Sequence, residues 1–327
     1  MSATGNFIAA AWRNYRMGFV VVAVGIILSF ASPHFLRVDN LVNVLTNSSL
    51  VAIVGLGMTL AIASGNFDLS VGSTAAFASC IALSLVPAHG VPLALLAGLL
   101  VGALVGLGNG LIISELRVPA FIATLGTMTI VRGFAFIYTK GQDITLFNDT
   151  SYKLLSAGHF LGVPFPIIMA LGLAALLAAM IKYTRFGRQI LAVGSNTPAA
   201  QRSGVRVNLV LWGTFAIVGV TAALVGMITS AQLLTANGRL DTGLELQAIA
   251  VVVIGGTSLS GGQATLTGTL FGSILVTMIN NGLNLLNVSD SYQRLTVGAL
   301  LLLAVAIEVT RGVDLRKVLK LGSNSTV

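Results

Sequence analysis

Apolar residues occur in long runs along the chain, and short segments rich in glycine, serine and charge separate these runs. A helix needs about 20 mainly apolar residues to cross the hydrocarbon core of a bilayer. The runs predicted to be membrane-spanning helices are 17–31, 43–63, 73–86, 91–113, 119–138, 165–183, 209–232, 244–257, 265–286 and 294–309. The pattern therefore predicts an all-α fold, a polytopic transmembrane helical bundle of about ten spans. We expect it to form a single domain over residues 1–327.

Two of the predicted spans, 73–86 and 244–257, are short for a bilayer crossing, and both adjoin stretches rich in glycine and serine. Non-helical backbone is tolerated at membrane depth where it is buried in protein or lines a cavity. We therefore expect broken or re-entrant helices at these two places.

The composition agrees with a membrane protein. Hydrophobic residues make up 55% of the chain, charged residues only 9%, and the mean hydropathy is +0.94. Soluble domains are about one-quarter charged, so a water-soluble globule of this size would lack polar surface. The single cysteine, Cys80, excludes an intrachain disulfide. The three histidines, His34, His89 and His159, are too far apart in sequence to suggest a metal cluster.

The net charge of +8 arises from 18 Lys and Arg against 10 Asp and Glu. Lys and Arg concentrate in the cytoplasmic loops of membrane proteins. With a cytoplasmic N-terminus, the predicted spans place twelve of these residues inside, five outside and Arg132 within a span. This bias predicts cytoplasmic tails at 1–16 and 310–327, and it accounts for the charge without a nucleic-acid partner. Run 17–31 follows basic residues as in a signal peptide, but no small-residue cleavage pattern comes after it, so we expect a retained helix.

The two halves of the chain share a short motif. Asn109-Gly110-Leu111 recurs 172 residues later as Asn281-Gly282-Leu283, and each copy precedes another glycine by the same interval. The copies are five spans apart and would have opposite orientations, as in the inverted repeats of many transporters. We expect such a repeat; chance recurrence in a chain with 37 glycines is the alternative.

The segment 64–73 places the carboxylate of Asp68 between two apolar runs. A charge at the centre of a bilayer costs about 2.5–3.5 kcal/mol on insertion scales, so Asp68 should face a cavity or a polar partner. Asn66, Asp68 and Ser70 are therefore candidates for a substrate pathway. The alternative is a cytoplasmic turn in which Asp68 caps the next helix, and the two interpretations are compatible.

The run from Pro119 carries Phe121, Thr124 and Thr127 at a spacing of three residues. An aromatic ring and hydroxyls are suited to face a sugar in the pathway. The alternative is helix packing in which each threonine bonds its own backbone. Arg132 lies deeper in the same run and needs a partner or a water-filled cavity, and Asp68 is a candidate partner.

Four glycines spaced by four residues, Gly98, Gly102, Gly106 and Gly110, lie on one face of a predicted helix. Gly268 and Gly272 repeat this spacing in a later span. Such a face lets a neighbouring helix approach closely, so it is a packing signal rather than a substrate signal.

The longest inside loop, 182–206, carries five positive charges and no negative one. Thr197, Pro198 and the alanines after them predict a short helix with Thr197 as its N-cap and Gly204 at its end. A short helix along the membrane surface could dock a cytoplasmic partner, and a basic loop that only fixes topology is the alternative.

The chain lacks the sequence signatures of an enzyme. In the glycine-rich stretch 254–263, the position that a phosphate-binding loop reserves for lysine is Gly262. The sequence contains no HExxH, no CxxC and no evident nucleophile–base–acid set. We expect a chain that neither hydrolyses ATP nor binds a cofactor or metal itself.

Five motifs in order resemble the ribose/arabinose-type permeases of bacterial ABC monosaccharide importers. They are SGNFDLSVGS at 64–73, NGLIISELRVPAFIATLGTM at 109–128, GRQILAVGSNTPAAQRSGV at 187–205, ELQAIAVVVIGGTSLSGG at 245–262 and NNGLNLLNVSDSYQ at 280–293. The resemblance covers nearly the whole chain, from Pro33 to Val309. SGNFDLSV and the pattern at 130–133 with 284–289 resemble the arabinose-type members, and Asn287 departs from the glycine usual in ribose-type members.

The resemblance implies a permease subunit in the bacterial inner membrane that translocates a pentose or hexose by alternating access. A second permease subunit, identical or paralogous, a cytoplasmic ABC ATPase that holds ATP and Mg, and a periplasmic sugar-binding protein would complete the importer. Segment 187–205 is similar to the family's coupling loop, here 184–208, which docks on the ATPase. The coupling candidates are Arg188, Gly194, Asn196, Pro198, Ala199, Ala200 and Gly204.

A proton-coupled secondary sugar transporter is the alternative class, because such transporters also use inverted repeats. It requires a titrating acid within the membrane, for which Asp68 is the candidate. A channel is a third class, but the sequence shows no evident filter motif.

Overall fold

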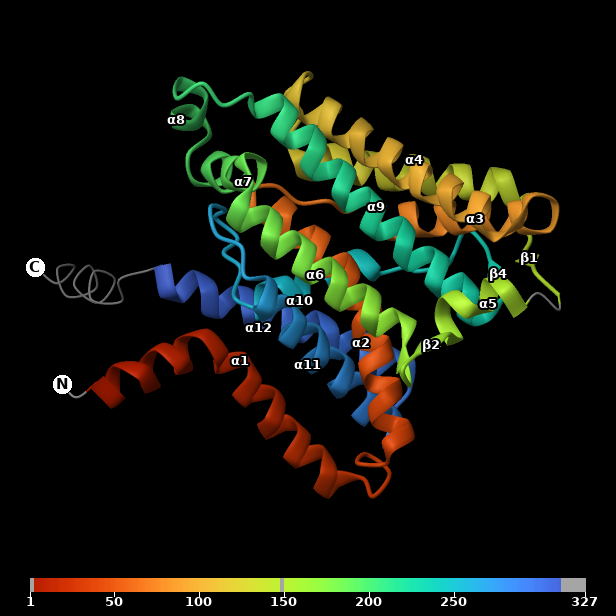
Figure 1. The fold of residues 1–327 in the computed structure, drawn as a ribbon, viewed down its shortest axis with the longest axis horizontal. Coiled ribbons are helices and arrows are strands. Elements are labelled where there is room, and N and C mark those ends of the chain that lie inside the picture. The colour runs from red at the N-terminus through yellow and green to blue at the C-terminus, as the bar shows by residue number, and fades with distance from the viewer. Residues whose placement is uncertain (1–2, 148–149, 313–327) are drawn as a thin grey trace, which may run out of the picture.

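The computed structural model describes residues 3–147 and 150–312, and the chain is mostly helical (Figure 1). The helices are α1 (Ala3–Ala31), α2 (Val38–Ala63), α3 (Val71–Ser114), α4 (Ala120–Thr139), α5 (Thr150–Ala157), α6 (Phe165–Tyr183), α7 (Arg185–Ser195), α8 (Thr197–Arg202), α9 (Val207–Leu233), α10 (Leu244–Ile254), α11 (Leu266–Leu285) and α12 (Asp290–Gly312). The strands are β1 (Ile144–Thr145), β2 (His159–Phe160), β3 (Val163–Pro164) and β4 (Thr235–Ala236). The predicted helical bundle is confirmed.

Within the described residues, six helices are long and apolar enough to cross a membrane. These are α2, α3, α4, α6, α9 and α11. Shorter apolar stretches lie in α1, α10 and α12, at Met17–Ala31, Leu244–Ile254 and Ser291–Ala306. Length and composition alone therefore do not confirm the predicted total of about ten spans.

Helix α3 joins two of the predicted spans. Its 44 residues would extend about 66 Å at 1.5 Å per residue, roughly twice the thickness of a bilayer core. The helix is interrupted at Gly90, whose φ of 75° and ψ of 168° are not helical, and Pro87 and Pro92 flank this kink. Glycine adopts this positive φ without the steric cost that a Cβ would impose. The chain reverses its direction here, because Asn109 near the end of α3 is hydrogen-bonded to Asp68 just before its start. The break predicted between 86 and 91 is therefore confirmed, and the two predicted spans are helices that lie side by side.

The apolar part of α1, Met17–Ala31, has the bounds of the first predicted span, and the residues before it are helical from Ala3. One predicted boundary needs correction. The expected eighth span ends at Ile254, and 255–265 has no helix because Gly256, Gly261 and Gly262 all adopt positive φ. At the other terminus α12 continues to Gly312, and the remainder of the predicted tail lies outside the described residues.

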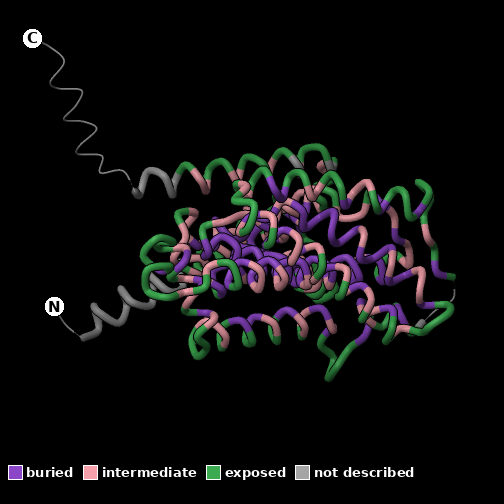
Figure 2. Tube along the Cα trace, turned by 90° about the horizontal axis from the view of Figure 1, so that it is seen from above, coloured by how far each residue is buried: buried purple, intermediate pink, exposed green. Residues whose placement is uncertain are grey.

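Helices α2 and α9 form the centre of the molecule, and the tube trace shows buried residues along its axis with exposed residues around them (Figure 2). The glycine stripe of α3 lies against α9, as predicted from its spacing. A Cβ on Gly102 would collide with the carbonyl oxygen of Gly219, and one on Gly106 with that of Phe215. Gly268 and Gly272 of α11 face the backbone of Gly255 and Val251 in the same way.

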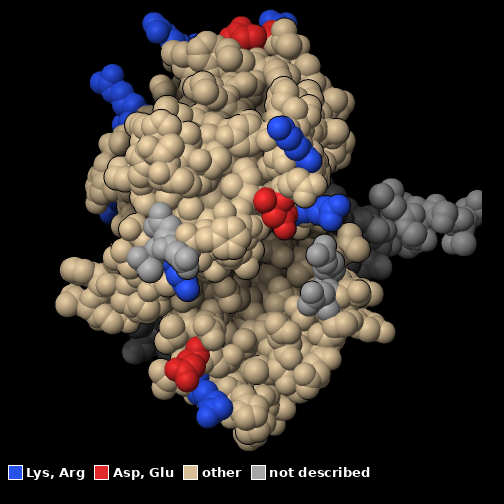
Figure 3. Space-filling model, turned by 90° about the vertical axis from the view of Figure 1, so that its right-hand side faces the viewer, with Lys and Arg blue, Asp and Glu red and all other residues tan. Residues whose placement is uncertain are grey.

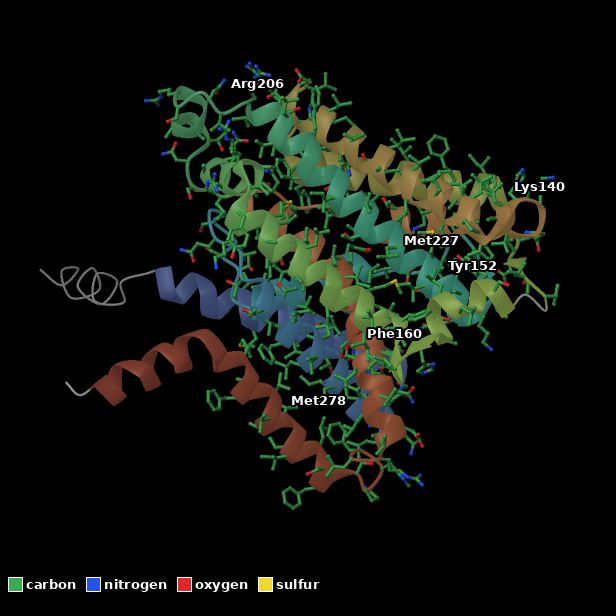
Figure 4. All side chains as sticks on the ribbon, viewed as in Figure 1. Lys140, Tyr152, Phe160, Arg206, Met227 and Met278 are labelled. Atoms are coloured by element: carbon green, nitrogen blue, oxygen red, sulfur yellow. The ribbon has the colours of Figure 1, made fainter. Side chains whose placement is uncertain are left out.

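The two ends of the bundle differ in structure. Helices α7 and α8 lie at one end, on the same side as the start of α1 and the end of α12 (Figure 1). The four short strands and α5 lie at the other end, which carries Lys140 and Phe160, whereas Arg206 lies at the α7–α8 end (Figure 4). We call these the helical end and the strand end.

At the strand end, β1 pairs with β4 and β2 with β3, both antiparallel. Tyr152 of α5 is fully buried (Figure 4). Its hydroxyl lies 2.8 Å from Ser230 Oγ and donates to the carbonyl oxygen of Met227 at 3.2 Å. These contacts attach α5 to the end of α9. Two-residue strands have no alternating hydrophobic pattern, so the sequence did not predict them.

The predicted inverted repeat is not confirmed by the contacts of its best-matching residues. Asn109 is fully buried and bonds to Asp68 and Ser70. Its counterpart Asn281 is partly buried and pairs with Asn40. The two copies of the motif therefore have different partners.

Candidate functional site

A buried cluster of three polar side chains, Asp68, Ser70 and Asn109, lies at the start of α3. Asp68, in the turn after α2, is 1% exposed, and its Oδ1 accepts hydrogen bonds from Ser70 N at 2.8 Å and Ser70 Oγ at 2.6 Å. Asn109 Nδ2 donates to both carboxylate oxygens at 3.3 Å and to Ser70 Oγ at 2.9 Å. Burial raises the pKa of the Asp68 carboxyl, and the hydrogen bonds from Ser70 and Asn109 oppose that shift. The bond from Ser70 N lies before the first helical residue, so Asp68 holds the turn and does not cap α3, which corrects the capping interpretation.

Arg132 does not pair with Asp68, which corrects the candidate pairing. Its Nη1 donates to the carbonyl oxygens of Gly238 and Leu240, both at 2.9 Å. The guanidinium also interacts electrostatically with Asp241 and Glu245. Arg132 therefore holds the segment before α10 against α4, and the sequence missed this because the partners are carbonyl groups more than 100 residues away.

The other pathway candidates occupy different environments. Phe121 is 58% exposed, whereas Thr124 is fully buried and donates to the carbonyl oxygen of Ala120 at 2.8 Å. Thr127 donates to the carbonyl oxygen of Ala123 at 3.0 Å, so both threonines bond their own helix. Asn66 is half-buried and donates to the carbonyl oxygen of Ser64 at 3.0 Å. Because these residues do not share one surface, a pathway that includes all of them remains a prediction.

Helices α7 and α8 form a capped, basic surface at the helical end. Thr184 Oγ1 accepts from Gly187 N at 3.1 Å and caps α7, a helix that the sequence did not predict. Asn196 Oδ1 accepts from Ala199 N at 2.9 Å and caps α8. The predicted cap Thr197 is wrong by one residue, because its hydroxyl donates to Val193 instead. The exposed cations of this surface are Lys182, Arg185, Arg188, Arg202 and Arg206.

The coupling candidates divide between exposed and internal positions. Arg188, Asn196, Pro198, Ala199 and Gly204 are exposed, whereas Ala200 is buried. Gly194 is internal, because a Cβ there would collide with the carbonyl oxygen of Ala63 and lie 2.7 Å from Gly262 N. Gly194 therefore brings α7 into contact with the end of α2 and with the loop between α10 and α11.

Two polar cavities lie at the strand end and share Gln247. The first, of about 420 Å³, is lined by Asn237, Arg239, Leu240, Asp241, Thr242, Leu244 and Gln247. The second, of about 220 Å³, lies between α2, α10, α11 and α12 and is lined by Val44, Asn47, Val51, Gln247, Thr277, Asn280, Asn281, Asn284 and Gln293. Figure 3 shows this end of the molecule hollowed near its middle, with acidic and basic side chains beside the hollow.

The described part of the chain contains no group of three or more His, Cys, Asp or Glu side chains that could hold a metal ion. The polar features described above are amides, hydroxyls, the Asp68 carboxylate, and Arg132 with the carboxylates of Asp241 and Glu245.

A family model described as a permease component of the branched-chain amino acid transport system matches residues 40–305. The chain belongs to this permease family. Membership makes it a membrane protein and a transporter subunit, in agreement with its apolar helices.

Several curated relatives of this permease are named as sugar permeases. It is 39% identical to the ribose import permease protein RbsC of Haemophilus influenzae over 92% of this chain and 95% of that protein. It is 34% identical to the L-arabinose ABC transporter permease protein AraH of Azospirillum brasilense over 90% of this chain and 88% of that protein. The D-allose transport system permease protein AlsC of Escherichia coli is 33% identical over 93% of both chains. No solved structure matches the permease.

Sequence reasoning missed the amide-lined cavity of the permease. Its residues come from four helices, and only Asn280, Asn281 and Asn284 are close enough in sequence to suggest a cluster. It also missed the carboxylates Asp241 and Glu245, because neither lies inside a predicted apolar run far from its ends.

Proposed function

We propose that this chain is the transmembrane permease subunit of an ABC importer that translocates a monosaccharide of the ribose, arabinose or allose class. The observation that carries this proposal is 33–39% identity to permeases of those three sugars over at least 90% of the chain. The family description names branched-chain amino acids, but all three of these relatives are named for sugars. The family also disfavours a proton-coupled secondary transporter, because its members are permease components.

The proposed topology has about ten crossings in the bacterial inner membrane. Two of the crossings are the halves of α3 on either side of Gly90, and five are the other long helices α2, α4, α6, α9 and α11. The shorter apolar stretches of α1, α10 and α12 supply the remaining three. The helical end would be cytoplasmic, because its exposed surface is basic, and it lies on the same side as the start of α1. The strand end would then face the periplasmic sugar-binding protein.

The proposed ATPase contact is the exposed part of α7 and α8. Both helices are capped, so their surface is preformed, and Arg188, Pro198 and Ala199 are accessible on it. ATP and Mg would be bound by the partner ATPase. A movement of α7 would reach α2 and the 255–265 loop through Gly194, which suits transport by alternating access in a homo- or heterodimeric permease.

The test is purification of the tagged permease from its native membrane in mild detergent, with identification of the copurifying chains. A stable ATPase partner, and ATP-driven uptake of D-ribose, L-arabinose or D-allose when its binding protein is added, would support the proposal. Uptake by the chain alone, driven by a proton gradient, would support the secondary-transporter alternative.

A further inference from the structure

The smaller cavity at the strand end is lined mainly by uncharged amide side chains. Six of its nine lining residues are amides, from α2, α10, α11 and α12: Asn47, Gln247, Asn280, Asn281, Asn284 and Gln293. None of its lining residues is charged. An amide offers both donors and acceptors, as a sugar hydroxyl does, so this lining matches a neutral polyol and offers no counter-charge to a zwitterionic amino acid.

Two of these amides are hydrogen-bonded to other residues of the protein, and the oxygen of a third has no hydrogen-bond partner among the described residues. Asn281 and Asn40 exchange reciprocal hydrogen bonds of 3.0 and 2.8 Å, and Gln293 Nε2 donates to the carbonyl oxygen of Val288 at 3.1 Å. Asn280 Oδ1, in contrast, is buried and has no partner among the described residues. A buried acceptor without a partner costs free energy, which indicates that an occupant supplies the missing donor.

The size and position of the cavity suit a single sugar. Its volume of about 220 Å³ is below the range of about 300–1,000 Å³ usual for drug-sized ligands, which fits a monosaccharide better than a longer saccharide. Through Gln247 it adjoins the larger cavity lined by Asn237 and Arg239. A sugar released at the strand end would therefore meet the amides next.

We propose that this amide-lined cavity binds the monosaccharide during its passage, with Asn280 Oδ1 accepting a hydrogen bond from a sugar hydroxyl. The inference rests on the proposed importer function and adds the residues that select a neutral sugar. Asn284 lies one turn after Asn280 on α11, and Gln247 approaches from α10, so the ligand would be bonded from two helices.

The test compares Asn280→Leu, Gln247→Leu and wild type for ATP-driven uptake of D-ribose, L-arabinose and D-allose in proteoliposomes with the ATPase and binding protein. We expect uptake to fall roughly three- to tenfold, since each variant loses one hydrogen bond to the sugar. Thermal stability of Asn280→Leu should equal or exceed that of wild type, because the orphaned acceptor is gone. A purely structural asparagine would instead lower stability and uptake together.

Asn43→Leu is the matched control, since Asn43 is exposed on α2 one turn before Asn47 and does not line the cavity. Unchanged uptake in both Asn280→Leu and Gln247→Leu would overturn the cavity proposal while leaving the importer function intact. A wild-type importer that moves none of the three sugars would overturn the proposed function and the cavity with it.

A second measurement does not depend on the folding of these variants. Cys80 is buried and is the only cysteine, so Asn284→Cys in a Cys80→Ala background places one reactive thiol at the cavity. We expect D-ribose, L-arabinose or D-allose to slow the alkylation of this thiol by a maleimide, and we expect fast alkylation in buffer without sugar. Labelling that none of the three sugars slows, in an importer that transports one of them, would contradict the proposal.

Discussion

Gly262 donates its backbone N–H to the carbonyl oxygen of Ala63 at 2.8 Å, which joins the loop before α11 to the last residue of α2. Gly194 of α7 packs directly on the same two groups. The basic helices at the helical end are therefore linked to the centre of the bundle by backbone contacts, where no side chain can adjust. We propose that any movement of α7 would be passed to α2 at Gly194.

We expect Gly194→Ala to impair coupling. The added Cβ collides with the Ala63 carbonyl and must displace α7 from α2, and overpacking of this kind costs about 1–3 kcal/mol. ATP-driven uptake should fall while the ATPase still copurifies, because the exposed docking surface is unchanged. Ala192→Val, which adds bulk at an exposed position of α7, is the control. Normal uptake in Gly194→Ala would show that this contact does not carry the coupling.

Arg188→Glu tests the docking surface itself. Arg188 is exposed on α7, so reversing its charge should leave the fold intact and weaken binding of the ATPase. We expect less copurified ATPase and less ATPase stimulation, with thermal stability within about 0.5 kcal/mol of wild type. Lys153→Glu, an exposed charge reversal on α5 at the strand end, should change neither. If both variants retain the ATPase equally, the docking surface lies elsewhere.

The helices could be predicted from sequence because most of the apolar runs have about the length of a bilayer crossing. The prediction for 165–183 agrees with α6 at both ends, and the glycine stripe correctly indicated a close approach of two helices. The break at Gly90 was also predicted, because two prolines and a glycine lie between the apolar runs 73–86 and 91–113.

The polar contacts were much harder to predict, because they join residues that are distant in the chain. Asp68 lies in the turn before α3 and its partner Asn109 lies near the end of α3, and the partners of Arg132 are backbone carbonyls. A charged residue within an apolar stretch of sequence can be predicted to be buried, but the sequence does not indicate which group it contacts. The amide cavity likewise appears only when four helices assemble.

The contact between α3 and α9 predicts a large effect of a single methyl group. Gly106→Ala should destabilise the protein by about 1–3 kcal/mol, because its Cβ would collide with the carbonyl oxygen of Phe215. Gly108→Ala, on the same helix, meets nothing within 4 Å and should be neutral or gain up to about 1 kcal/mol of helix propensity. Thermal unfolding in detergent measures both. Equal stability of the two variants would mean that the helices can separate freely at this point.

Asp241 predicts a dependence of stability on pH. Its Oδ2 is buried without a hydrogen-bond partner among the described residues. Burial raises the pKa of the Asp241 carboxyl to about 6. A hydrogen bond from Thr229 and the charge of Arg132 oppose this shift. Glu245 contributes a further upward shift through its own charge. A carboxyl whose pKa is higher in the folded state stabilises the fold most below its ordinary pKa of 3.8, and this stabilisation is lost as the pH rises through about 6.

Between pH 4 and pH 7 this group should therefore lower the free energy of unfolding by up to about 3 kcal/mol. We expect Asp241→Asn to remove most of this loss, because the amide remains neutral across the range. Asp143→Asn, at an exposed carboxylate of the same end, should keep the pH dependence of wild type. Thermal unfolding at pH 5 and pH 7.5 measures the difference, and identical pH profiles for wild type and Asp241→Asn would show that Asp241 is already ionised at both values.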